Sequence, residues 1–307
     1  EIYMVQIKNL VIDGNNASLT YDGTRVHYAG ISLQNAHDCT IENVEIKKIL
    51  TGATIALWDT GCFNNVINKN HIHDCGSAIT PCDGMYVQGD AVITNNIVEE
   101  ARDVGILNFG QSVGSVISNN KVYKPLYYGI EVGSDGLNCI VSNNVIDGDG
   151  TVLVGINMQD YPGQHQNKVT ITGNSIFNIQ HQSIYIKYAS DIVISNNLID
   201  GNAITQTGIQ IDQSVASYSN ITISSNIIKR MTDRAIHIDY SRNIVISSNI
   251  VEQITGTDGI TLAFSNSASI TANSVTSIAR YGIQLYACNY TTVSSNTSQY
   301  TGNSAYK

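Results

Sequence analysis

Two short phrases of the sequence end in a carboxylate. GIQID (208–212) and AIHID (235–239) both alternate apolar and polar residues, and both finish on an Asp. If the phrases lie side by side, the carboxyl groups of Asp212 and Asp239 are about 5 Å apart, close to the separation in a retaining glycosidase. Two carboxylates that close also split their pKa values, so one could act as a general acid and the other as nucleophile or base.

A second acid–base set lies beside the first. SIYIK (183–187) supplies Tyr185 and Lys187, and AIHID supplies His237. These residues could carry out β-elimination on a uronic acid, with one neutralising the carboxylate while another takes the C5 proton. A third interpretation assigns no chemistry, since Lys187 would then only offset the charge of Asp212.

These phrases belong to a repeat that runs almost the whole length of the chain. The pattern apolar-x-x-Asn-x-apolar recurs every 23 to 30 residues. Its Asn residues are Asn70, Asn96, Asn120, Asn144, Asn174, Asn197, Asn226, Asn249, Asn273 and Asn296. A nearly fixed period of this size indicates a solenoid.

Each repeat also contains the phrase Gly-Ile-x-apolar or a close variant of it, as in GIEV (129–132) and GINM (155–158). Both phrases alternate with period two, so each predicts a short strand with one buried face. Only 13% of residues are charged and there are 3 Pro and 17 Tyr, a composition that favours strands over helices. The sequence therefore predicts an all-β fold: one parallel β-helix domain over 1–307, with about 11 or 12 coils stacked about 4.8 Å apart.

The repeated Asn is predicted to be structural. In a parallel β-helix, identical positions on successive coils stack into columns along the axis. An Asn at a bend can turn its amide inward and bond the Asn above and below, which satisfies polar groups that a tight turn would strand. We therefore expect a buried amide ladder rather than a catalytic column, with flanking aliphatics such as Ile194 and Ile199 in the core.

The outward positions of the Gly-Ile-x-apolar strands are the candidate binding surface. The coil that contains GILN (105–108) is expected to break the register of these positions. From 131 to 240 they concentrate amides, acids, Tyr, Lys and His, over about five coils or roughly 20 to 25 Å, which suits four or five sugar units. The predicted substrate-binding residues are Glu131, Asn157, Gln159, Asp160, Tyr185, Gln210, Tyr240 and Trp58. Amides and carboxylates can bond sugar hydroxyls, and Tyr rings offer flat faces for pyranoses.

The repeat resembles the right-handed parallel β-helix superfamily that includes pectate lyases, mannuronan epimerases and phage tailspikes. The resemblance covers essentially the whole chain, and IKNLVIDGN (7–15) followed by CTIENVEI (39–46) looks like the early coils of tailspikes and epimerases. It implies a polysaccharide partner and a location outside the cell or on a virion surface. The epimerases share a Tyr, Asp, His motif, and at the matching position ALWDTG (56–61) has Trp58 and Asp59 without the His. EARDVG (100–105) lacks the matching His too, so C5-epimerase activity is only an alternative.

Charge and cysteine usage limit the partners. The formal charge of −9, with only 16 scattered Lys and Arg, disfavours nucleic acid and anionic membranes. The six Cys have no paired spacing, and INKNHIHDC (67–75) with Cys62 and Cys82 matches no standard zinc motif, so no metal site is predicted. No cofactor is expected either, although a bound cation such as Ca²⁺ could help to hold an acidic glycan.

The ends of the repeat carry no visible cap. An uncapped solenoid exposes strand edges that favour association. We therefore expect the chain to be part of a longer protein or a member of an oligomer such as a homotrimer. The predicted function is a glycan depolymerase of lyase or glycosidase type, with a non-catalytic carbohydrate-binding or adhesin stalk as the alternative from a different class.

Overall fold

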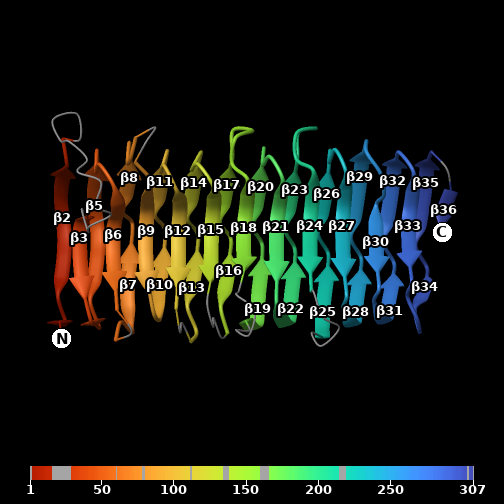
Figure 1. The fold of residues 1–307 in the computed structure, drawn as a ribbon, viewed down its shortest axis with the longest axis horizontal. Coiled ribbons are helices and arrows are strands. Elements are labelled where there is room, and N and C mark those ends of the chain that lie inside the picture. Colours follow the sequence, from red (N-terminus) through yellow and green to blue (C-terminus); the bar gives the residue numbers. More distant parts are fainter. Residues whose placement is uncertain are drawn as a thin grey trace.

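The computed structural model describes residues 2–15, 29–59, 61–77, 80–110, 113–133, 138–159, 166–213, 219–302 and 304–306. These residues form strands, turns and bends arranged as an elongated solenoid, with the strands stacked side by side along its length (Figure 1). Every strand pairing is parallel. Within the described ranges we find no helix with the length and apolar character needed to span a bilayer.

One face of the solenoid is a sheet of twelve strands, here called the front sheet because it faces the viewer in Figure 1. Its strands are β3 (Ala29–Gln34), β6 (Gly52–Trp58), β9 (Cys82–Gln88), β12 (Val104–Phe109), β15 (Tyr128–Gly133), β18 (Val154–Gln159), β21 (Gln182–Lys187), β24 (Thr207–Asp212), β27 (Arg234–Asp239), β30 (Ile260–Ala263), β33 (Tyr281–Tyr286) and β36 (Ser304–Tyr306). The Gly-Ile-x-apolar phrases form these strands, which confirms the predicted all-β parallel β-helix.

The remaining coil segments form a second sheet of 22 strands, here called the bent sheet. Its strands are β2 (Gln6–Asp13), β5 (Thr40–Lys47), β7 (Asn65–Asn68), β8 (His71–His73), β10 (Ala91–Thr94), β11 (Ile97–Glu99), β13 (Val116–Ser118), β14 (Lys121–Tyr123), β16 (Ile140–Ser142), β17 (Val145–Asp147), β19 (Gln166–Thr172), β20 (Ser175–Phe177), β22 (Ala189–Ser195), β23 (Leu198–Asp200), β25 (Ser219–Ser224), β26 (Ile227–Lys229), β28 (Arg242–Ser247), β29 (Ile250–Ile254), β31 (Asn266–Thr271), β32 (Ser274–Ile278), β34 (Thr292–Ser294) and β35 (Thr297–Thr301). The short strands β1 (Ile2–Tyr3) and β4 (Ala36–His37) pair separately.

The core is a stack of aliphatic side chains inside the coils. Ile184 and Ile186 of β21, and Ile209 and Ile211 of β24, are fully buried. They are level with each other on neighbouring coils, so each layer packs against the next. Because inward and outward residues alternate along a strand, burying these side chains fixes which residues of the front sheet face outward.

The Asn column forms the predicted amide ladder at the bend of the bent sheet. Asn174 Nδ2 donates to Asn197 Oδ1 at 3.0 Å, and Asn197 Nδ2 donates to Asn226 Oδ1 at 2.9 Å. Asn197 Nδ2 also donates to the carbonyl oxygen of Ile171 at 3.0 Å. The preceding residue, Asn196, has a φ of 55°, a left-handed conformation that turns the chain between β22 and β23. The ladder therefore satisfies polar groups that the bend would otherwise leave unpaired.

Candidate functional site

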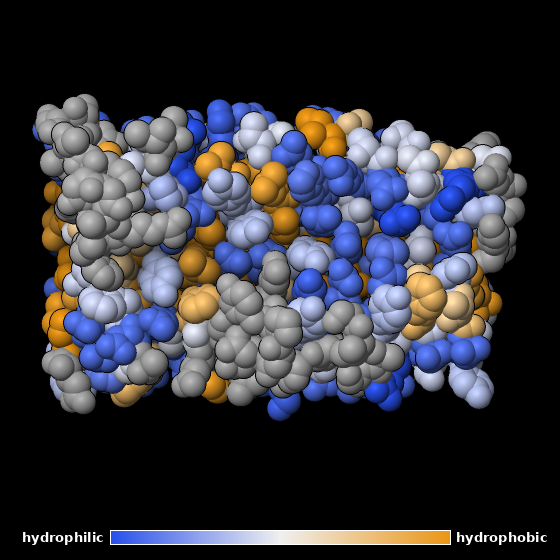
Figure 2. Space-filling model, in the orientation of Figure 1, coloured by the Kyte–Doolittle hydropathy of each residue, from blue (hydrophilic) through white to orange (hydrophobic). Residues whose placement is uncertain are grey.

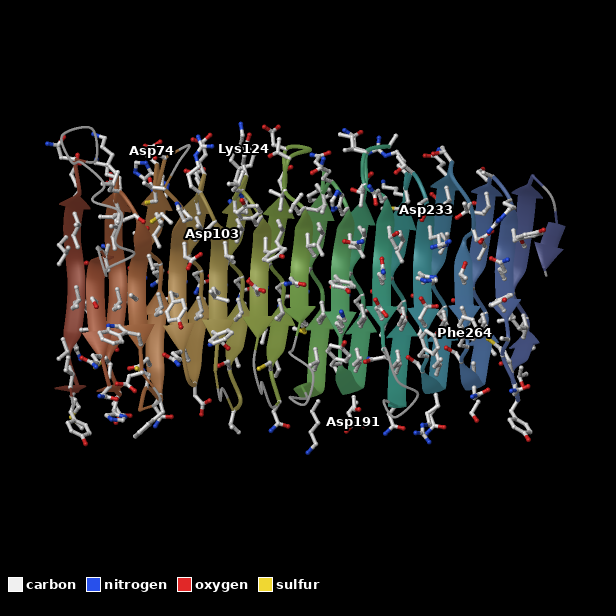
Figure 3. The ribbon with its side chains drawn as sticks, viewed as in Figure 1. Asp74, Asp103, Lys124, Asp191, Asp233 and Phe264 are labelled. Carbon is white, nitrogen blue, oxygen red and sulfur yellow. The ribbon has the colours of Figure 1, made fainter. Side chains whose placement is uncertain are left out.

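The outward face of the front sheet has two columns of residues, one between the two inward positions of each strand and one directly after them. The first column reads Ser32, Ala56, Tyr86, Leu107, Glu131, Asn157, Tyr185, Gln210, His237, Thr261 and Gln284. The second reads Gln34, Trp58, Gln88, Phe109, Gly133, Gln159, Lys187, Asp212, Asp239, Ala263 and Tyr286. Figure 2 shows hydrophilic residues gathered over β21 to β27, and Figure 3 draws described side chains along the same sheet.

The expected break in register at GILN is wrong. Leu107 is level with Tyr86 and Glu131, so this coil stays in register with its neighbours. Asn108, at the inward position, is fully buried, and its Nδ2 donates to the carbonyl oxygens of Val87 and Gly89 at 3.1 Å each. A polar residue is accommodated inside the solenoid here because its amide bonds the backbone of the preceding coil.

The predicted catalytic residues lie together on three consecutive strands. Asp212 of β24 and Asp239 of β27 are level with each other, as the repeat predicted. Tyr185 Oη lies 3.5 Å from Asp212 Oδ2, and His237 Nε2 lies 2.8 Å from Asp239 Oδ2. The other ring nitrogen of His237, Nδ1, is buried and has no hydrogen-bond partner among the described residues. The sequence reasoning placed the two Asp residues together but missed that each has its own partner.

Lys187 is level with Asp212 but does not form an ion pair with it in the described part of the chain. Its ammonium group lies 5.1 Å from the centre of the Tyr188 ring instead. The position is compatible with a cation–π contact. In the described part of the chain, no ion pair supports the interpretation that Lys187 only offsets the charge of Asp212. Lys187 is therefore available to an acidic group from solution.

Glu131 and Asn157 form a polar pair in the middle of the first column. Asn157 Nδ2 donates to Glu131 Oε1 at 2.9 Å. The pKa of Glu131 is raised to about 7, because burial and the negative charge of Asp103 raise it by more than the hydrogen bond from Asn157 lowers it. Asn157 is only 1% exposed, and its Oδ1 has no hydrogen-bond partner among the described residues.

A pocket of about 280 Å³, here called the central pocket, opens on this part of the front sheet. It is lined by Tyr128, Leu153, Val154, Asn157, His181, Gln182, Tyr185 and Gln210. Gln182 Nε2 donates to Gln210 Oε1 at 3.1 Å. Burial, followed by the nearby Asp212 carboxylate, raises the pKa of Tyr185 to about 12, so this hydroxyl stays protonated and can donate to a ligand. The structure thus brings together three predicted binding residues, Asn157, Tyr185 and Gln210.

A second pocket of about 330 Å³, here called the N-terminal pocket, lies on the same face. Trp58, Tyr86, Gln88, Asp83 and Asp103 are among the residues that line it. Trp58 Nε1 donates to Ser32 Oγ at 3.0 Å, which orients the indole ring. Trp58 was a predicted binding residue, but Asp83 and Asp103 were missed.

The missed residues share one signal. Asp83, Tyr128 and Gln182 stand just before the Gly-Ile phrase or its Ser-Ile variant, and Asp103 stands one position earlier. Asp83, Tyr128 and Gln182 occupy equivalent positions of their strands. On the coil of Asp103 that position holds Val104, which is level with Tyr128 and buried. Asp83 and Asp103 add carboxyl groups to the N-terminal pocket, and Tyr128 and Gln182 add a hydroxyl and an amide to the central pocket.

Three predicted binding residues, Tyr240, Gln159 and Asp160, either have a covered ring or have no described side chain. Tyr240 follows β27, and its ring stacks on Phe264, with centroids 4.8 Å apart and an angle of 7° between the planes. Phe264, labelled in Figure 3, covers one face of Tyr240, so a sugar can reach only the rest of that ring. The backbone of Gln159 is level with Lys187, but the side chain of Gln159 and the whole of Asp160 lie outside the described residues.

The segment INKNHIHDC has paired side chains but no metal-binding group. His71 Nε2 lies 2.9 Å from Glu99, and His73 lies 2.8 Å from Asp74 and 3.4 Å from Glu45. Among the described residues, no three His, Cys, Asp or Glu side chains are placed to hold a metal ion together. Cys39, Cys62, Cys75, Cys82 and Cys288 are free thiols.

Comparison with solved structures finds the same fold at low sequence identity. The catalytic unit of a thermostable α-1,3-glucanase from Streptomyces thermodiastaticus matches with a TM-score of 0.72 and 15% identity, over 90% of this chain and 56% of that one. The A-module of a mannuronan C-5 epimerase from Azotobacter vinelandii matches with a TM-score of 0.69 and 12% identity, over 99% and 89%. A surface adhesin of Streptococcus pneumoniae matches with a TM-score of 0.66 and 12% identity, over 99% and 85%. This chain therefore spans little more than half of the glucanase unit.

Comparison with family models identifies the family of this chain. No curated protein sequence matches the chain. A model described as a periplasmic copper-binding protein matches only residues 214–306. The model described as a right-handed beta helix region matches residues 1–116 and 109–257, which together are most of the sequence. The chain therefore belongs to the right-handed beta helix family.

Proposed function

We propose that this protein binds an extended glycan along the outward face of the front sheet and hydrolyses it there. The observation that carries the proposal is the alignment of two pockets on that face, with polar and aromatic side chains in both. The N-terminal pocket supplies Trp58 and Tyr86, and the central pocket supplies Tyr185 and Gln210. Aromatic rings and amides on one rigid face are suited to a chain of pyranoses.

The chemistry proposed for cleavage uses the carboxylates of the central strands. Asp212 and Asp239 are level on neighbouring coils and next to Tyr185 and His237. In hydrolysis one carboxylate attacks the anomeric carbon or activates the attacking water, while a protonated acid gives its proton to the leaving oxygen. Elimination is the second candidate, because Lys187 has no ion pair in the described residues and could neutralise the carboxylate of a uronic acid.

The comparisons support a glycan partner in a general way. The glucanase and the epimerase are named for polysaccharide chemistry. Because all of these structures share less than a sixth of their residues with this chain, they support the class of ligand and not a particular sugar. The adhesin is a surface protein, and a periplasmic family model matches one end of the chain, so we propose that the protein works outside the cytoplasm. A virion location, a homotrimer and an optional bound Ca²⁺ remain predictions.

A non-catalytic glycan-binding stalk is the alternative, and it is favoured by the extended, regular face and by the match to an adhesin. The test is incubation with a panel that includes α-1,3-glucan, alginate and mannuronan, while reducing ends and the ultraviolet absorbance of unsaturated uronates are followed. Hydrolysis predicts new reducing ends without the absorbance. Elimination would give both signals, and binding without either signal would support the stalk and contradict the proposed cleavage.

A further inference from the structure

Three aromatic side chains touch one another on the front sheet, just beyond the carboxylates of the candidate site. Tyr240 follows β27, Phe264 follows β30, and Tyr286 ends β33. The rings of Tyr240 and Phe264 are stacked, and the ring of Tyr286 lies crosswise to that of Phe264, with centroids 5.2 Å apart and 87° between the planes. Phe264 is labelled in Figure 3. These three residues are here called the aromatic step.

The aromatic step is exposed although its rings are largely apolar. Tyr240, Phe264 and Tyr286 are 38%, 41% and 58% exposed. Leaving apolar ring surface in water forgoes the stabilisation that burial would give, and exposed apolar patches rimmed by polar residues mark binding surfaces. Contact among the three rings does not hide them, so the step still offers ring surface to a ligand.

The backbone under the step departs from what its residue types favour. The residue directly after a front strand has a left-handed φ, which is 49° at Asn35, 79° at Gly89 and 70° at Gly110. Asn and Gly tolerate this region well. The same turn holds Tyr240 and Phe264, with φ of 51° and 50°, and a bulky residue at positive φ is uncommon and strained. Rings are therefore present where a small residue would fit with less strain, which points to a use for the rings themselves.

The step lies next to the acidic pair, on the side away from the central pocket. Tyr185 of the central pocket lies on β21, one strand before Asp212, and Phe264 follows β30, one strand after Asp239. Four strand spacings separate β21 from β33, which is roughly 19 Å and suits about four sugar units. The acidic pair lies in the middle of this length.

The position between the acidic pair and Tyr286 is held by a small residue. Ala263 is level with Asp239 on one side and with Tyr286 on the other. Its side chain is one methyl group, so the second outward column is low between the carboxylate and the ring. Carboxylates accept from sugar hydroxyls, and ring surfaces pack against the C–H groups of a pyranose. A sugar seated above Ala263 would therefore reach both kinds of group.

We propose that the aromatic step and Ala263 form a subsite for one pyranose unit of the glycan, on the side of the acidic pair opposite to the central pocket. The sugar packs against the exposed ring surface of Phe264 and Tyr286, and its hydroxyls face the Asp239 carboxylate. This inference rests on the proposed function and deepens it, because a glycan held on both sides of the acidic pair is cut at an internal bond. The protein is then an endo-acting depolymerase whose first products are oligosaccharides.

The test measures Phe264→Ala and Tyr286→Ala in the whole chain, on whichever of α-1,3-glucan, alginate and mannuronan is cleaved. Both side chains are exposed, so the fold should be retained, which circular dichroism and thermal unfolding check. We expect KM to rise by roughly three- to tenfold with kcat changed less than about twofold, because the rings bind substrate and transition state alike. Tyr286→Phe, which keeps the ring, should behave as wild type.

The matched control is Tyr123→Ala on β14, an aromatic residue of the bent sheet that is 37% exposed, and it should leave KM unchanged. Chromatography of the first products tests internal cleavage, which should give oligosaccharides of several lengths before monosaccharides. Unchanged KM in both ring variants overturns the subsite. Release of only monosaccharides from the start overturns its place beside the acidic pair. If light scattering shows instead that Tyr286→Ala only abolishes self-association, the step is a contact between copies and the glycan subsite is overturned.

Binding measurements separate failure of this inference from failure of the proposed function. Affinity electrophoresis in gels that contain alginate or mannuronan, and co-sedimentation with α-1,3-glucan, report affinity whether or not the glycan is cut. A wild type that binds but cleaves nothing contradicts the proposed cleavage. In that case, binding weakened by roughly three- to tenfold in both ring variants still supports the subsite, and equal binding overturns it. A wild type that neither binds nor cleaves overturns the proposed function and this inference together.

Discussion

The bend of the bent sheet and the outward face of the front sheet are built from the same repeat, but one repeats a single residue type and the other varies it. At the bend, ten successive coils from Asn70 to Asn296 place the same residue, and nine amide-to-amide hydrogen bonds of 2.9 to 3.0 Å join them. On the front sheet, neighbouring coils place different residues at the same outward position. The Asn column is uniform and the outward columns of the front sheet are varied, although all of them repeat with the same period.

The difference teaches how a solenoid separates stability from function. An amide is both donor and acceptor, so a column of identical Asn side chains satisfies itself. On the outward face each polar group needs its own partner, as in the pairs Glu131–Asn157 and Gln182–Gln210. Where that partner is missing, as for Asn157 Oδ1, a ligand can provide it. Uniform columns therefore indicate scaffold, and a varied column of polar and aromatic residues indicates a binding surface.

The largest effect is expected at the acidic pair on the varied face. Asp212→Asn and Asp239→Asn should each lower turnover by roughly 100- to 10,000-fold, because Asn cannot accept a proton or hold His237 as a carboxylate does. Thermal unfolding should change little, since both side chains face outward. If both variants stay active while His237→Ala or Lys187→Ala abolishes activity, elimination replaces hydrolysis. Full activity in all four would place the chemistry elsewhere.

The uniform column should respond through stability instead. Asn197→Ala removes one amide of the ladder and leaves Asn174 and Asn226 without their partner, so the free energy of unfolding should fall by about 1 to 3 kcal/mol. Asn296→Ala, at the rung joined to Asn273, should cost less because Asn296 is only half-buried, so water can replace its hydrogen bonds. Denaturant unfolding of both variants measures the difference. Equal stability of Asn197→Ala and wild type would contradict the placement of the ladder.

A pH effect on stability should come from the varied face and not from the neutral ladder. Since burial raises the pKa of Glu131 to about 7, the folded protein holds this proton more tightly than the unfolded chain does. Its contribution is therefore present at low pH and is lost as pH rises from the ordinary pKa of a Glu toward about 7, by roughly 1 to 3 kcal/mol. Glu131→Gln should reduce the difference between unfolding free energies at about pH 5 and about pH 8, and an unchanged difference would show that Glu131 does not titrate in this way.

The smallest effect is expected on glycan affinity. Tyr185→Ala and Gln210→Ala remove single contacts in the central pocket, so each should weaken binding of an uncleaved oligosaccharide by about tenfold, or about 1.4 kcal/mol. Calorimetric titration measures this, and Thr292→Ala on β34 of the bent sheet serves as the control. Unchanged affinity in both pocket variants would move the main contact to Trp58 and Tyr86 in the N-terminal pocket.

Most of the fold was predictable because the repeat sets both the period of the coils and the alternation within the strands. The spacing of Asn174, Asn197 and Asn226 gave the period and the buried column, and the alternation in GIQI and AIHI gave the strands. The level placement of Asp212 and Asp239 followed from the same alignment. Stacking at a fixed spacing leaves little freedom, so residues at equivalent positions must be neighbours. The sequence by itself therefore determined the β-helix, its amide ladder and which residues share an outward column.

Only the tertiary structure decided how side chains on that face pair and where it is hollow. The bond between His237 and Asp239 depends on rotamers of two residues on one strand, and the orphaned oxygen of Asn157 depends on what its neighbours leave unfilled. The sequence suggested a break in register at GILN because Asn108 is polar at a core position. The structure keeps it inside because backbone oxygens of the preceding coil accept from its amide. The burial of Glu131 likewise depends on side chains of neighbouring coils. Side-chain pairing, cavities and desolvation are set by atoms from several coils at once, and a one-dimensional repeat records position but not these contacts.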